Sequence, residues 1–132
     1  MKSIDLADAV LARLASATPA AMSAHDGRPE KTPTGLYCYL TDDPGLAGGT
    51  RLDGTEADLA WTINVVAVGP TAPGARLAAS FVRDALTGWR PDPHRSAGPL
   101  TELSVGPLLT DGPEGDLRHS QTIIYRHHGS RS

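Results

Sequence analysis

The chain has 132 residues, which is the usual length of one domain and is long enough to bury a core without disulfides or a structural metal. A net charge of −3 argues against free nucleic acid as a partner, because proteins that bind it usually present a basic face to the phosphates. The single cysteine excludes an internal disulfide, and no window approaches the roughly 18 apolar residues of a membrane span. We therefore expect one domain, residues 1–132, without membrane contact.

The N-terminal segment predicts an amphipathic helix from Ser3 to about Ala17, because its apolar residues recur at helical spacing. Ser3 is suited to the N-cap position, and Pro19 ends the helix since the residue before a proline is pushed out of the α region. Residues 19–34 predict a long polar loop, because Gly and Pro interrupt any regular pattern there.

Two strands are predicted next, over residues 35–41 and 58–68. Cys38 falls on an apolar face of the first strand, which favours a buried, inert thiol. Residues 42–57 are rich in Gly and Asp, and they form the long tip of a hairpin if the two strands pair. The second half of the strand 58–68 is apolar on both faces, as expected of a central strand that is covered on both sides or buried in an oligomer.

A second helix is predicted between Thr71, a suitable N-cap, and Gly88, a suitable C-terminal stop. Pro73 falls in its first turn, where the missing N–H costs nothing. Two strands follow, a weak one over residues 100–109, interrupted by a Gly-Pro pair, and a stronger one over residues 118–128. This order of elements predicts an α+β fold.

Signatures of catalytic, nucleotide-binding and metal-binding sites are missing from the sequence. There is no GxGxxG, GxxxxGK[ST], CxxC, HExxH or GxSxG. His119 and His127 lie about 27 Å apart on an extended strand, and His127 and His128 point to opposite faces. An exposed C-terminal tail is therefore favoured over a zinc site. We expect no cofactor, no metal and no enzymatic activity.

One longer pattern in the middle third of the chain resembles a known family. A strand ends in V-x-V-G at Val66–Gly69, a short Thr/Pro linker follows, and a helix closes on L-x-G-W-R-P at Leu86–Pro91. As a unit, Gly54–Pro91 resembles the tail-terminator (tail completion) proteins of long-tailed phages of actinobacteria. The flanking segments are similar in the order of their elements.

The resemblance implies a mixed, mostly antiparallel sheet packed with two helices, and subunits that form a homo-hexameric ring. Such a ring sits on the head-proximal end of the tail tube, stops its growth and joins the tail to the head connector. The implied partners are further copies of the chain, the tail-tube protein and the head-closure or connector protein, while DNA passes through the lumen without sequence-specific binding. The implied location is the tail or neck of the virion, assembled in the host cytoplasm.

Two loops and one helix face are the candidate contact surfaces. We expect the tip at 42–57 and the loop at 19–34 to contact adjoining rings, and the arginine-bearing face of the second helix is a candidate for the lumen. The candidate interface residues are Asp42, Asp43, Leu46, Arg51, Asp53, Arg76 and Arg83.

Two other functions remain open on the sequence. A head-closure or stopper protein of the same neck also forms rings without catalytic residues. A small ligand-binding α+β module would need polar groups that converge on an apolar pocket, and Thr62, Asn64 and Tyr125 are the candidates for such groups.

Overall fold

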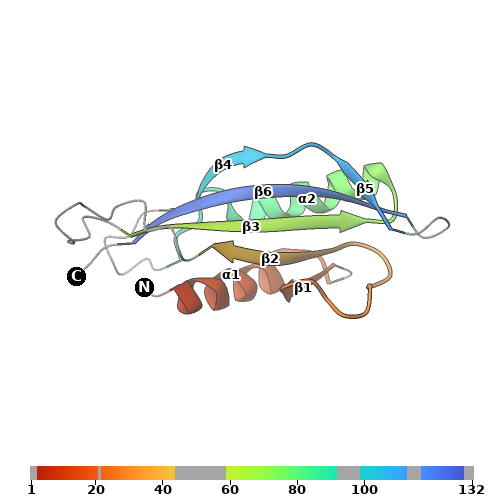
Figure 1. The fold of residues 1–132 in the computed structure, drawn as a ribbon. Coiled ribbons are helices and arrows are strands. Elements are labelled where there is room, and N and C mark those ends of the chain that lie inside the picture. The colour runs from red at the N-terminus through yellow and green to blue at the C-terminus, as the bar shows by residue number, and fades with distance from the viewer. Residues whose placement is uncertain (1–2, 21, 44–58, 92–98, 113–116, 130–132) are drawn as a thin grey trace.

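The computed structural model of the chain describes residues 3–20, 22–43, 59–91, 99–112 and 117–129. These residues form two helices and six strands (Figure 1). In chain order they are α1 (Ser3–Ala17), β1 (Ser23–Asp26), β2 (Tyr37–Asp43), β3 (Leu59–Gly69), α2 (Ala72–Leu86), β4 (Thr101–Val105), β5 (Leu109–Asp111) and β6 (Arg118–Gly129). The α+β prediction is confirmed.

The strands form one mixed sheet in the order β1-β2-β3-β6-β4, and β5 also pairs with β6. All pairs are antiparallel except β1 with β2, which is parallel. The long strands β3 and β6 pair from Leu59↔Gly129 to Gly69↔His119, and Figure 1 shows them side by side at the centre of the sheet. The mixed, mostly antiparallel sheet implied by the resemblance is therefore present.

The predicted pairing of the two strands on either side of residues 42–57 is confirmed. β2 and β3 are antiparallel, and β2 continues to Asp43, which pairs with Thr62. The strand thus runs two residues beyond the predicted end at Thr41. Residues 44–58, the rest of the predicted tip, lie outside the described residues.

Both helices pack against one face of the sheet, and the core lies between them. The side chains of Ile63, Val65 and Ala67 alternate along β3 toward this side and are buried. α1 adds Val10 and Leu14 to the same cluster. The remaining buried members from the helices and neighbouring strands include Cys38, Leu40, Ala78, Val82, Ala85, Leu86, Ile123 and Tyr125.

α2 begins and ends as its sequence predicts. The Thr71 side chain accepts a hydrogen bond from the Gly74 backbone N–H at 3.0 Å, and a proline lies in the first turn. Gly88, just past the helix, has a φ of 77°, the left-handed conformation that glycine adopts without strain. The first turn also lies directly over Gly69, where an added Cβ would be 2.6 Å from the backbone nitrogen of Ala75.

The prediction of an unbroken loop over residues 19–34 is wrong, because β1 lies within it. Ser23 pairs with Tyr37 and Asp26 with Leu40, so these four residues extend the sheet beside β2. The four residues show no apolar alternation that would predict a strand. They form one because β2, parallel to them, supplies the backbone hydrogen bonds.

The predicted strand over residues 100–109 is in fact two short strands, β4 and β5. The register of β4 on β6 shifts between Glu102 and Ser104, which is a bulge or local irregularity. Past β4, the Gly106 backbone N–H donates to the Thr122 carbonyl at 2.8 Å before β5 resumes pairing at Leu109. The Gly-Pro pair thus interrupts this edge of the sheet, as its weak pattern indicated.

Candidate assembly surfaces

The helices do not pack on the second face of the sheet, which we call the open face, although Tyr37 and Val68 are buried at one end of it. Cross-strand register places Thr41, Asn64 and Ile124 in one row on it. Val66 and Thr122 form the neighbouring row, and these two, with Asn64 and Ile124, are half-buried. Apolar and polar uncharged side chains therefore share a surface that the subunit itself does not bury completely, as expected for a contact surface.

An aromatic cluster occupies the β1–β2 end of the open face. The rings of His25 and Tyr37 meet edge to face with centroids 6.2 Å apart, and Tyr37 stacks on Tyr39 at 6.4 Å. Tyr37 is only 5% exposed, whereas Tyr39 is half-buried. Tyr39 thus presents part of an aromatic ring on the open face. Aromatic side chains are enriched in protein interfaces.

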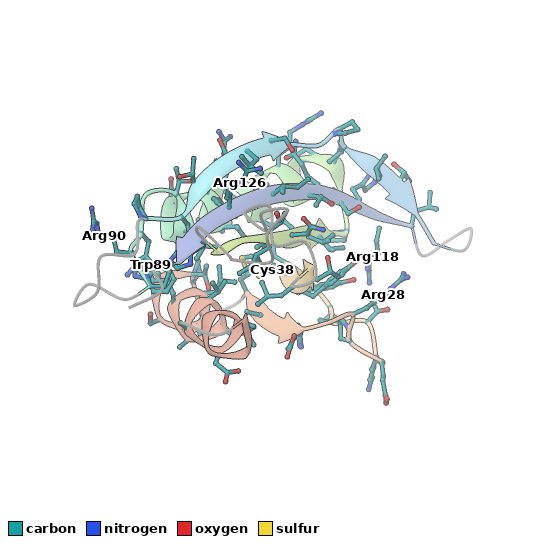
Figure 2. All side chains as sticks on the ribbon, turned by 60° about the vertical axis from the view of Figure 1, so that its left-hand side comes forward. Arg28, Cys38, Trp89, Arg90, Arg118 and Arg126 are labelled. Atoms are coloured by element: carbon teal, nitrogen blue, oxygen red, sulfur yellow. The ribbon has the colours of Figure 1, made fainter. Side chains whose placement is uncertain are left out.

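By register, strand positions on the open face carry charged residues of both signs. Among its strand side chains that the structure describes, the charged ones are Arg118 and Arg126, toward opposite ends of β6 (Figure 2). Arg126 is exposed, and within the described residues it makes no ion pair or side-chain hydrogen bond. Its row holds Asp43, Thr62 and Thr101, and the side chain of Asp43 lies outside the described set.

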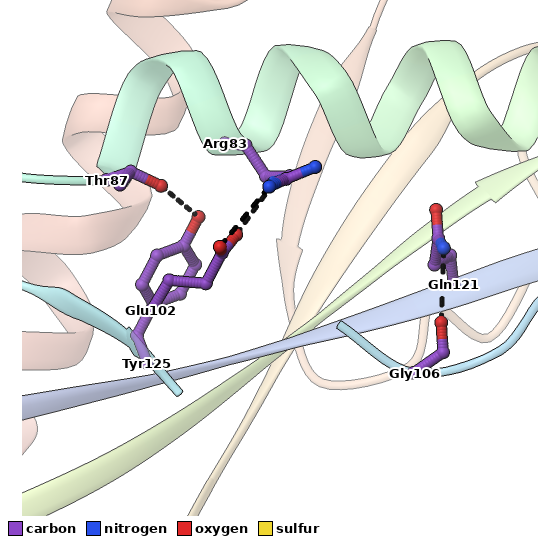
Figure 3. Close-up of polar contacts among 6 residues, drawn as sticks. All are labelled: Arg83, Thr87, Glu102, Gly106, Gln121 and Tyr125. Atoms are coloured by element: carbon purple, nitrogen blue, oxygen red, sulfur yellow. Dashed lines mark hydrogen bonds and ion pairs between the residues drawn. The ribbon is translucent and has the colours of Figure 1, made fainter. Parts of the chain in front are cut away.

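On the helix side of the sheet, a polar junction joins α2 to β4 and β6 (Figure 3). Arg83 Nε donates to Glu102 Oε1 at 2.7 Å, and its Nη2 donates to Oε2 at 3.3 Å. The Thr87 and Tyr125 hydroxyls lie 3.1 Å apart. The hydrogen bonding of Arg83 to the Glu102 carboxylate raises the pKa of Arg83, and burial raises the pKa of Tyr125. The junction therefore holds the edge strand β4 against the helix.

A shallow pocket lies on the solvent side of α2 beside this junction. It has a volume of about 260 Å³ and is lined by Ser80, Arg83, Asp84 and Thr87. Glu102 compensates the charge of Arg83, whereas the exposed Asp84 makes no ion pair within the described residues. We call this site the Asp84 pocket; one cation and one anion, Arg83 and Asp84, line it.

The structure describes some of the predicted interface residues and not others. Arg76 and Arg83 lie seven residues apart on the exposed side of α2, and Arg83 is engaged within its own subunit. Asp42 and Asp43 belong to β2, with side chains outside the described set. The other three, Leu46, Arg51 and Asp53, lie outside the described residues.

The prediction of an exposed C-terminal tail is wrong for His127. Its side chain is fully buried. Its backbone pairs with Trp61, and alternation along β6 places residue 127 on the same side of the sheet as Tyr125, which faces the helices. β6 continues as a central strand to Gly129, so the end of the described chain belongs to the sheet. Among the described residues, no group of three or more potential metal ligands is present.

The polar groups considered for a small-ligand site do not converge. Tyr125 pairs with Ile63 on the helix side, whereas Asn64 pairs with Ile124 on the open face. Thr62 shares the open face with Asn64, since alternate residues of a strand point the same way. The candidate groups are therefore separated by the sheet.

The predicted burial of Cys38 is confirmed. The thiol is fully buried, and burial raises its pKa from 9.0 to about 12. Burial therefore favours the protonated form of the thiol at neutral pH, which is the weaker nucleophile. In the described part of the chain, neither helix is long and apolar enough to cross a membrane.

Comparison with known proteins identifies the fold. A chain in the solved structure "Virion of native gene transfer agent (GTA) particle" is similar to this chain with a TM-score of 0.52 and 21% sequence identity. The match covers 91% of this chain and 84% of that chain. No protein-family model and no curated protein sequence match it. At this identity the comparison establishes a fold shared with a chain of a phage-like particle.

Proposed function

We propose that this protein is a structural component of a phage-like tail, where it forms a ring on the head-proximal end of the tail tube. The ring ends tube polymerisation and joins the tail to the head connector. The observation that carries the proposal is the fold shared, over nearly the whole chain, with a chain of a gene transfer agent virion.

The surfaces of the subunit support an assembly role over an enzymatic one. The open face offers half-buried Val66, Ile124 and Tyr39 to a partner. The thiol of Cys38 is fully buried, and the Arg83 guanidinium is paired with Glu102. These are features of a subunit that works through contacts with other proteins.

The test is to add the purified protein to polymerising tail-tube protein of the same particle and to measure tube lengths by negative-stain electron microscopy. We expect short tubes, each with added density at one end. Tubes that grow to the same length with and without the protein would contradict the terminator role. Unchanged tubes, together with rings on isolated head connectors, would instead support the head-closure or stopper alternative.

A further inference from the structure

We draw no further inference here: the strongest candidate, the β4–β5 edge of the sheet with the exposed side chains of Leu103 and Leu109, carries none, because a register shift within β4 and Pro107 after it interrupt the edge and nothing in the described part of the chain shows what covers it.

Discussion

At the residue scale, the buried thiol of Cys38 links stability to pH. In the unfolded chain the thiol ionises near 9.0, whereas in the fold burial raises its pKa to about 12. Between these values the unfolded state loses its proton first, so the free energy of unfolding falls by roughly 1.4 kcal/mol per pH unit from this group. Below pH 9 the contribution is fully present.

The check is urea unfolding at several pH values from 8 to 11, for the wild type and for Cys38→Ala. The alanine variant should lack the part of the slope that Cys38 contributes, although a cavity lowers its stability at every pH. Tyr125 adds a slope of the same sign in both proteins, because burial raises its pKa too. Equal slopes in the two proteins would show that the thiol is not protected as described.

Gly69 shows why the V-x-V-G pattern ends in glycine. A Cβ there would lie 2.6 Å from the Ala75 nitrogen and 2.7 Å from the Gly74 carbonyl carbon. Gly69→Ala should therefore lower the free energy of unfolding by about 1–3 kcal/mol, because the first turn of α2 must move away. Gly106→Ala is the matched control, since its nearest atom is 3.5 Å away. Equal thermal stability of the two variants would contradict this close approach.

Some residue environments can be predicted from the sequence and others cannot. Cys38 lies in an alternating strand, and alternation alone predicts burial. The burial of His127 does not follow from its local sequence, because it depends on pairing with β3, far away in the chain. Thr62 and Tyr125 belong to different strands, so only the register decides that they point to opposite sides of the sheet.

At the element scale, the Arg83–Glu102 pair is the link between α2 and the edge strand β4. Glu102→Gln removes the charge that holds both guanidinium donors. Amide exchange of β4 should then become several-fold faster, while exchange in β3 stays the same, because the edge strand opens locally.

Thr101→Ser, an exposed change on the same strand, is the control and should leave β4 exchange as in the wild type. Unchanged β4 protection in Glu102→Gln would mean that backbone pairing with β6 alone retains the strand.

The elements found from sequence are those with a strong period. Both helices and the strands β2, β3 and β6 follow from helical or alternating spacing of apolar residues. β1 was missed because its four residues join the sheet through a parallel neighbour rather than through an apolar face of their own. The division between β4 and β5 depends on how Gly106 binds to β6, which a local pattern does not specify.

At the scale of the whole molecule, the two helices cover one face of the sheet and not the other. The second half of β3 is apolar on both faces, which predicts that both faces are covered or that the strand is buried in an oligomer. In the structure the helices cover one of these faces. Val66 and Ile124 on the other side remain half-buried. The sequence alone placed the candidate interface in the loops and on α2, because the open face appears only when β2, β3 and β6 are brought into register.

The central claim is that this chain ends the tail tube at the side of the head. It is tested most directly by deleting its gene from a genome that encodes the particle and measuring tail lengths by electron microscopy. We expect tubes of variable and excessive length, together with heads that carry no tail, and recovery of both defects when the gene is restored. Tails of normal length attached to heads in the absence of the protein would contradict it.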